Sequence, residues 1–304
     1  MLEKIKWNSI FVKKYTKLKI ATLNIDWFKK SKDLQLIIKD QIKKQDLDFL
    51  IVNENIESFT FDEKYFTYHS KSIPIDKEFQ YLDYGVYLKG ATPVRTSIYS
   101  KHEAIKQLKT SDSYTSICCV YSVKKQEIAI YGTIIGTWGI KYQKELASVE
   151  LENFKSDVEN ISKEYENVFI VGDFNTSFFE NEKRHLPTVN SRTELVNFTD
   201  KLNIHRATEK IENCIDHIFI SNNLKQISNL KTATFLENNI LKDDPHKGIV
   251  LEMQFSRLKI ATDSANFLNR NRIFHRVIVA FLFRQRIFGR NDTVGSHTMK
   301  GIPR

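Results

Sequence analysis

The sequence predicts one layered α/β domain followed by a basic tail of different composition. Strand-like apolar segments alternate with helix-like segments through the first 256 residues, and no repeat or low-complexity linker interrupts them. The chain has 304 residues and 41% apolar content, which is enough to bury a sizeable core. We therefore expect a globular domain in which helices cover a sheet, and not a disordered chain.

Seven segments predict strands because each is short and rich in Ile, Val, Phe or Tyr. They cover residues 18–25, 47–52, 116–123, 127–135, 168–171, 215–220 and 248–255.

Two segments predict helices. Residues 31–44 begin with Ser31, a favourable N-cap, and Asp33 follows in the first turn. In residues 144–165, apolar side chains recur at spacings of three and four, which builds one stripe along the helix. We expect this stripe to cover a face of the sheet. It consists of Leu151, Phe154, Val158, Ile161 and Tyr165.

The charge lies mostly in the tail. The whole chain carries a net charge of +9, but residues 257–304 hold ten Lys or Arg and two Asp, a net of +8, which leaves +1 for the first 256 residues. Eight of the ten basic residues of the tail are Arg, whereas Lys dominates before it. We therefore expect an N-terminal extension over residues 1–17, a catalytic domain over residues 18–256, and a basic tail over residues 257–304.

The tail has two interpretations besides an extension without a catalytic role. Residues 267–290 mix Arg with apolar residues and are compatible with a basic helix that binds nucleic acid or an anionic membrane surface. Their longest uninterrupted apolar run covers residues 277–283, far short of the roughly 20 residues that span a bilayer.

Cysteine usage and the N-terminus predict a cytoplasmic protein. The cysteines are three, and their spacing matches neither a disulfide framework nor a zinc site, so we expect reduced thiols in the core. Residues 1–14 are charged throughout and lack the apolar segment of a signal peptide. The cysteines are Cys118, Cys119 and Cys214.

Polar side chains follow or precede five of the predicted strands, at the places where loops on a rigid scaffold usually carry function. Each has a structural explanation as a turn former, cap or surface charge, but carboxylates that converge in one cleft repel each other unless they are protonated or share a cation. Oxygen ligands without thiolates favour Mg²⁺ or Mn²⁺. The residues are Asn24 and Asp26, Asn53 and Glu54, Asp173 and Asn175, Asp216 and His217, and Asp244 and His246.

These segments resemble the endonuclease/exonuclease/phosphatase superfamily over about residues 18–255, in the order of that family. The most specific segment is GDFN after VFIV, and the next is IDHIFIS. The resemblance implies a four-layer α/β/β/α sandwich like that of deoxyribonuclease I, with two packed mixed sheets and helices on the outer faces. The matching segments are TLNID, LIVNEN, GDFNTSF, NCIDHIFIS and DPHKGIVLEM.

The resemblance also implies metal ligands. Glu54 would be the main Mg²⁺ ligand, with Mn²⁺ as a substitute, and Asn24 would lie at the same metal. Asp26 matches an acidic position of the abasic-endonuclease branch, and Asp244 is a further candidate ligand.

The catalytic roles are implied in the same way. Asp173 would orient or deprotonate the attacking water, and Asn175 would hold a phosphate oxygen. His246 would bind or protonate the phosphate, and Asp216 would set the tautomer of its ring. Because alternate residues of an extended chain face the same side, we expect Asp173 and Asn175 to lie side by side. Trp138 is a candidate substrate contact that could stack on a base.

Two positions depart from the family pattern. Pro245 occupies the place of an Asp next to the metal and offers no ligand, which leaves Asp243 or Asp244 to compensate. The segment 128–139 lacks the His, or the Tyr and Asn, that relatives use to help the leaving oxygen, a loss that can cost about 10²–10⁴-fold in rate. The nearby polar or aromatic residues, which favour structural roles, are Thr137, Trp138, Lys141 and Tyr142.

The sequence therefore predicts a Mg²⁺-dependent phosphodiester hydrolase, with a nuclease favoured. Two alternatives remain open. One is a phosphohydrolase that acts on lipid or inositol phosphate headgroups and is recruited by the tail. The other is a catalytically impaired binding member of the same fold.

Overall fold

The apolar segments form the centres of two sheets. The computed structural model describes residues 16–27, 30–73, 92–136, 144–179, 190–236 and 246–255, and within these ranges twelve strands form two sheets of six. The chain divides into two compact units, Met1–Phe255 and Ser256–Arg304. The predicted tail lies outside the described residues and stays a prediction. The same holds for the N-terminal extension, except that Thr16 and Lys17 begin the first strand.

The first sheet contains the two ends of the described chain. In spatial order its strands are β11 (Ser228–Phe235), β12 (Gly248–Phe255), β1 (Thr16–Asn24), β2 (Phe49–Ile56), β4 (Pro93–Ser100) and β3 (Phe66–His69).

The second sheet contains the middle of the chain. In spatial order its strands are β5 (Ala104–Leu108), β6 (Ser116–Val123), β7 (Gln126–Ile134), β8 (Val168–Asp173), β10 (Asp216–Ser221) and β9 (Ile204–Arg206).

Both sheets follow one plan, with a parallel pair at the centre and antiparallel neighbours outside. In the first sheet β1 and β2 are parallel and α1 (Lys32–Gln45) connects them. In the second sheet β7 and β8 are parallel and α2 (Lys144–Glu164) connects them. The other strand pairs that the structure describes are antiparallel. In each sheet, the carboxyl ends of the two central strands therefore lie side by side at the same end of the sheet.

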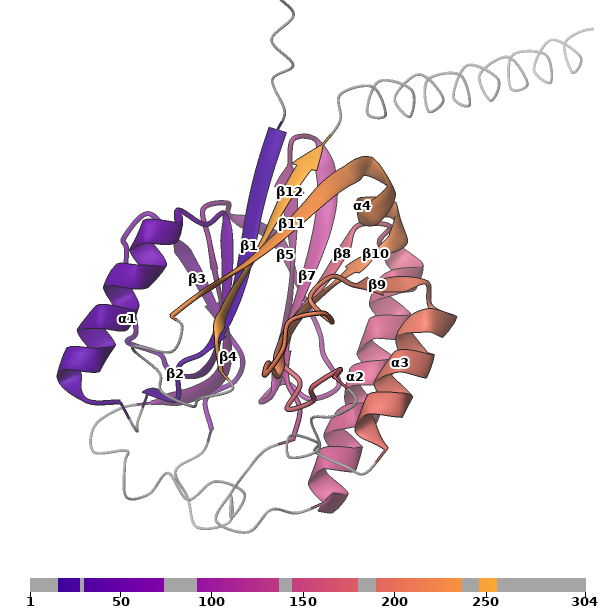
Figure 1. Ribbon diagram of the computed structural model, residues 1–304, viewed down its shortest axis with the longest axis horizontal. Helices are drawn as coiled ribbons and strands as arrows, with labels where there is room; N and C mark the ends of the chain where they lie inside the picture. Colours follow the sequence, from indigo (N-terminus) through magenta and orange to yellow (C-terminus); the bar gives the residue numbers. More distant parts are fainter. Residues whose placement is uncertain are drawn as a thin grey trace, which may run out of the picture. The chain divides into compact units, whose positions relative to one another are not determined.

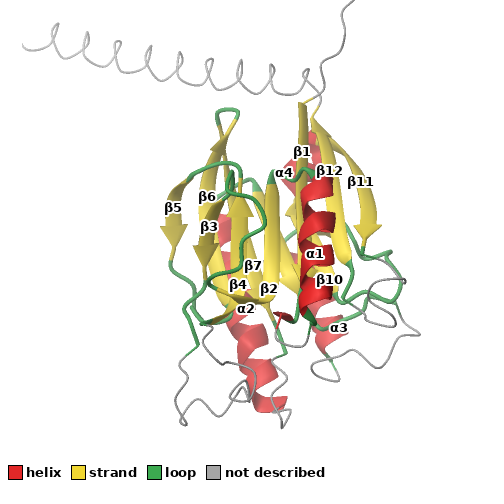
Figure 2. Ribbon diagram, turned by 90° about the vertical axis from the view of Figure 1, so that its left-hand side faces the viewer, coloured by secondary structure: helices red, strands yellow, loops and turns green. Residues whose placement is uncertain are grey.

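Helices cover the outer faces, so the layers run α/β/β/α, as the sequence resemblance implied (Figure 1). Helix α1 lies on the first sheet, and α2 lies with α3 (Ser191–Lys201) on the second. Figure 2 shows α1 on the near side of the sheets and α2 behind them. A short helix, α4 (Asn222–Ile227), joins β10 to β11.

The two predicted helices form where the sequence places them. The side chain of Ser31 caps α1 by accepting a hydrogen bond from the backbone N–H of Leu34 at 3.3 Å. The apolar stripe of α2 packs on the second sheet, with Leu151, Phe154, Val158 and Ile161 buried and Tyr165 at its edge. None of the helices in the described part of the chain is long and apolar enough to cross a membrane. All three cysteines are free and buried, as predicted.

Several elements lack the apolar pattern that would predict them. Strands β3, β5 and β11 lie at sheet edges and are largely exposed, and β9 has three residues. Strand β4 is fully buried but carries Arg95, Thr96 and Ser97 in its centre. Helices α3 and α4 were likewise not predicted. Strand β2 continues through Asn53 and Glu54 to Ile56, beyond the predicted end at residue 52.

Gly172 allows the second sheet to bend just before Asp173. Its φ is +147°, and a Cβ atom added to it would lie 1.9 Å from the backbone oxygen of Thr133 on β7. Only glycine tolerates both the dihedral angle and this approach of two backbones. The bend coincides with an unusual backbone contact, because the N–H of Asp173 donates across the sandwich to Asn53 on β2.

We predict that Gly172→Ala lowers the free energy of unfolding by at least about 3 kcal/mol, since it adds both backbone strain and a clash with backbone atoms. Gly132→Ala is a matched control on β7, where the added Cβ meets the Thr96 methyl at 3.0 Å and the clash is milder. Urea denaturation of both variants tests the difference. Equal losses of unfolding free energy in the two variants would show that the close approach of the β7 and β8 backbones does not restrict residue 172 to glycine.

Candidate active site

Polar side chains from both sheets converge beyond the ends of the central strands. On the first sheet Asn24 is the register partner of Asn53. On the second sheet Asp173 is the register partner of Asp216. His246 precedes β12 and joins the same group. Sequence positions up to 222 residues apart thus come together because the two sheets pack face to face.

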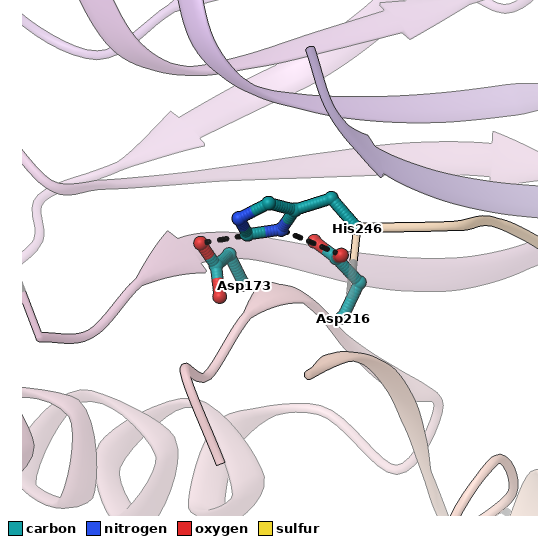
Figure 3. A group of neighbouring side chains, drawn as sticks. All are labelled: Asp173, Asp216 and His246. Carbon is teal, nitrogen blue, oxygen red and sulfur yellow. Dashed lines mark hydrogen bonds and ion pairs between the residues drawn. The ribbon is translucent and has the colours of Figure 1, made fainter. Parts of the chain in front are cut away.

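Asp173, Asp216 and His246 form a group of three potential metal-ligand side chains in the described part of the chain (Figure 3). One ligand atom from each lies within 4.8 Å of the others. His246 Nδ1 is 3.0 Å from Asp216 Oδ2 and 4.0 Å from Asp173 Oδ2. Both carboxylates are buried, whereas the histidine side chain is 19% exposed. The imidazole is therefore the part of the group that a ligand from solvent can reach.

The contact with Asp216 determines which ring nitrogen of His246 carries the proton. A carboxylate accepts hydrogen bonds, so Nδ1 of His246 carries the hydrogen that points at Asp216. The catalytic role that the resemblance implied for the pair stays a prediction.

Asp173 accepts hydrogen bonds from two asparagines. Asn24 Nδ2 donates to Asp173 Oδ2 at 2.9 Å, and the backbone N–H of Asn175 donates to Oδ1 at 2.8 Å. Burial raises the pKa of Asp173 to about 7. His246 and these hydrogen bonds lower the pKa, while the charge of Asp216 raises it further. A carboxyl group with a pKa near neutrality is suited to take a proton from water at physiological pH.

Asn175 reaches Asp173 by a turn and not by strand alternation. Strand β8 ends at Asp173, and Asn175 has a left-handed backbone with φ of 45°. Its Nδ2 donates to Ile135 O at 2.9 Å, to Gly136 O at 3.3 Å and to Asp173 Oδ2 at 3.3 Å. The amide thus ties the end of β7 to Asp173. Its predicted contact with a phosphate oxygen stays a prediction.

Three of the predicted site residues have left-handed backbones. The φ values are 37° for Asp26, 50° for Glu54 and 45° for Asn175. Residues with a Cβ seldom adopt this region, and they persist there only where the surroundings hold them. The backbone N–H of Asp26 donates a hydrogen bond to Asn24 Oδ1 at 2.9 Å, and this contact holds the backbone conformation of Asp26. Left-handed backbones therefore occur at these predicted site residues, as they do at six other described residues with a Cβ.

The donors that the described residues bring together are compatible with a divalent cation. The group whose ligand atoms lie within 4.8 Å of one another consists of Asp173, Asp216 and His246 and does not include Glu54 or Asp26, whose roles as metal ligands stay predictions. Thiolates are absent from this set, which favours Mg²⁺ or Mn²⁺ over zinc. The predicted ligand Asp244 and the predicted substrate contact Trp138 lie outside the described residues.

Trp27 is not a free stacking platform. Its ring meets the ring of Phe59 edge-on at 4.8 Å between centroids, and the ammonium of Lys39 lies 5.4 Å from its centroid. These contacts make Trp27 part of the packing beneath α1.

Polar groups to which the sequence analysis gave no role support the site. Asn53 is fully buried and bonds to both sheets. Arg95 on β4 and Glu150 on α2 form a buried ion pair at 2.9 Å, and Glu150 also accepts a 2.7 Å hydrogen bond from the N–H of Gly136. Asn53 stands next to Glu54 in the motif, which is a usable signal. Arg95 and Glu150 are 55 residues apart, and no sequence signal indicates that they form a pair.

We predict that the stability difference between the wild type and Asp173→Asn falls as pH rises from about 4 to about 7. The folded protein binds a proton at Asp173 more tightly than the unfolded chain does. The stabilisation is therefore complete below the unfolded pKa of 3.8 and is lost as pH rises through the folded value. The loss should amount to a few kcal/mol, at roughly 1.4 kcal/mol per pKa unit.

Urea denaturation between pH 4 and pH 8 in EDTA measures this difference, because subtraction of the variant removes the contributions of other groups. A difference that does not change with pH would contradict the raised pKa.

Comparison with solved structures finds this fold in proteins of low sequence identity. A 3′–5′ exonuclease from Neisseria meningitidis has a TM-score of 0.57 at 14% identity, over 78% of this chain and 100% of that chain. An AP endonuclease from Archaeoglobus fulgidus has a TM-score of 0.55 at 16% identity, over 77% and 98%. An endonuclease/exonuclease/phosphatase family protein from Leptotrichia buccalis has a TM-score of 0.51 at 13% identity, over 78% and 100%.

The sequence itself matches no family model and no curated protein. The likeness is therefore one of structure, and it agrees with the order of the motifs along the chain. The chain has the fold of the endonuclease/exonuclease/phosphatase structures.

Proposed function

We propose that the protein hydrolyses phosphodiesters with a bound divalent cation and that nucleic acid is its substrate. The observation that carries the proposal is the contact set of Asp173: a buried carboxyl group held by Asn24 and Asn175, with His246 and Asp216 on its open side. Each part has a task in the displacement of an oxygen from phosphorus.

Asp173 is the general base. Its raised pKa lets it take a proton from water near neutral pH, and its hydrogen bonds fix the direction of its oxygens. A water bound next to Asp173 would then be positioned to attack the phosphorus atom.

His246 is the cationic group for the phosphate. Protonated at both nitrogens, its ring keeps the bond from Nδ1 to Asp216 and presents the Nε2–H to a phosphoryl oxygen. Asp216 is buried and stabilises this positive charge. The pair thus offsets the negative charge that grows on the phosphoryl oxygens.

Glu54, with Asn24 and Asp26, holds the divalent cation. Mg²⁺ or Mn²⁺ bound there supplies a Lewis acid that neutralises charge on the phosphate. The left-handed backbones of Glu54 and Asp26 turn these residues out of the regular ladder at the ends of their strands.

Nucleic acid is favoured as the substrate by the solved structures with this fold. One of them is a Neisseria 3′ phosphatase bound to a product DNA hairpin, with a TM-score of 0.57. The exonuclease and the AP endonuclease also act on nucleic acid by their names. The tail, with its excess of Arg, is a second candidate contact for a polyanion.

A good leaving group is expected in the substrate. In the described part of the segment 128–139, Tyr131 is the titratable side chain, and its hydroxyl is bonded to Ser116 and Asp157. It lies in the cluster beneath α2 and not at the strand ends. The segment lacks the His, or the Tyr and Asn, that relatives use to help the leaving oxygen, so activated diesters should react faster than DNA.

We predict that Asp173→Ala and His246→Ala each lower the rate of hydrolysis by about 10²–10⁴-fold, the usual worth of a general acid or base. The substrates are bis-p-nitrophenyl phosphate and supercoiled plasmid, with Mg²⁺, Mn²⁺ or EDTA. His205→Ala, a histidine on β9 of the same sheet, is the control that should keep the wild-type rate. A wild type as inert as the variants under every metal would favour the impaired binding member.

We predict that Mg²⁺ or Mn²⁺ raises the Tm of the wild type and that Glu54→Gln removes most of this rise, because the variant loses the charged ligand. Glu57→Gln is the matched control, since Glu57 lies three residues further on and is exposed. Differential scanning fluorimetry with and without EDTA measures both shifts. An undiminished rise in Glu54→Gln would place the cation elsewhere.

A further inference from the structure

Asn53 is a buried amide that bonds to both sheets at once. It is the last inward-facing residue of β2 before the backbone turns at Glu54, and its exposed fraction is 0%. Its Nδ2 donates to the backbone oxygen of Thr133 on β7 at 2.9 Å and to Thr96 Oγ1 on β4 at 3.0 Å. The backbone oxygen of Arg95 lies 3.4 Å away as a third acceptor.

The oxygen of the same amide holds Asp173. Asn53 Oδ1 accepts the backbone N–H of Asp173 at 3.1 Å. The carbonyl oxygen of Thr133 accepts only from a donor and the N–H of Asp173 donates only to an acceptor, so these partners fix the orientation of the amide. A side-chain bond thus replaces a ladder bond at the residue that we assign as the base.

The bend at Gly172 makes this bond possible. In a regular strand the N–H of Asp173 would lie in the plane of the second sheet and pair with a neighbouring strand. The φ of +147° at Gly172 turns the following peptide so that its N–H points at the first sheet. Asn53 and Gly172 therefore act together, one as the acceptor and the other as the hinge.

We propose that Asn53 is a positioning residue that fixes Asp173 from the opposite sheet. It touches neither the phosphate nor the water, and it acts through the backbone of Asp173. The effect on turnover rests on the proposed function, whereas the anchoring of Asp173 does not.

Asn55 provides a matched control. It is the same residue type on the same strand, it is also 0% exposed, and its side chain donates to Ser97 Oγ at 3.2 Å and Tyr99 Oη at 2.7 Å. These partners belong to the outer side of the first sheet, beneath α1, where Tyr99 packs. Loss of Asn55 should therefore destabilise the protein without moving Asp173.

The experiment compares the wild type with Asn53→Ala and Asn55→Ala in the full chain, at a temperature where all three are folded. For Asn53→Ala we expect kcat on bis-p-nitrophenyl phosphate to fall by about 10- to 100-fold with KM little changed, because a small misplacement of a base slows chemistry more than binding. Asn55→Ala should keep the wild-type kcat. If Asn53→Ala does not fold, Asn53→Ser takes its place, because its hydroxyl is too short to reach Asp173.

A second readout does not depend on activity. The amide proton of Asp173, followed by ¹H–¹⁵N NMR, should exchange with solvent faster in Asn53→Ala than in Asn55→Ala once each rate is corrected for the global stability of the variant. A wild-type kcat in Asn53→Ala, or an unchanged exchange rate, would overturn the proposal. If the wild type hydrolyses no diester, the proposed function fails, and the exchange rate alone still decides whether Asn53 holds Asp173.

Discussion

The hydrogen bond between Asn53 and the backbone of Asp173 fixes how the two sheets face each other at the site. Apolar packing between sheets is not directional and allows small shifts of one layer against the other. A buried bond of 3.1 Å does not, because breaking it leaves a donor and an acceptor without partners. Asn24 is the register partner of Asn53, so the same bond brings Asn24 to Asp173.

The buried charged groups of the site lower the stability of the folded state, and the rest of the fold offsets this loss. Two buried carboxylates, Asp173 and Asp216, lie as cross-strand partners at the edge of an apolar core. Burial and, to a lesser extent, the charge of Asp216 favour the protonated form of Asp173, which is why its pKa rises. A nearby cation or a protonated His246 relieves the repulsion between the two carboxylates. The same groups that weaken the folded state without a ligand should therefore bind a cation and a phosphate more tightly.

The sequence predicts those elements whose position depends on a local apolar pattern or on a single polar residue. Strands 116–123 and 248–255 have the predicted bounds because apolar residues dominate each segment. Strand-end residues such as Asp173 are visible because a carboxylate interrupts an apolar run. Asn53 and Asn55 look equivalent in the motif NEN, and they differ only in the face that each presents. Which face meets the other sheet depends on packing that local periodicity does not contain.

The site lies where the central parallel pairs of both sheets end, and neither sheet holds it alone. Asn24 comes from the first sheet, His246 lies just before β12, and Asp173 and Asp216 come from the second sheet. A hydrogen bond weakens steeply when its atoms move by a few tenths of an ångström, whereas apolar contacts between the layers tolerate such a shift. A small change in the packing of the two sheets therefore separates Asp173 from its anchors while the core stays buried. Activity should be lost before the fold is, because the chemistry depends on directional contacts and the fold depends mostly on burial.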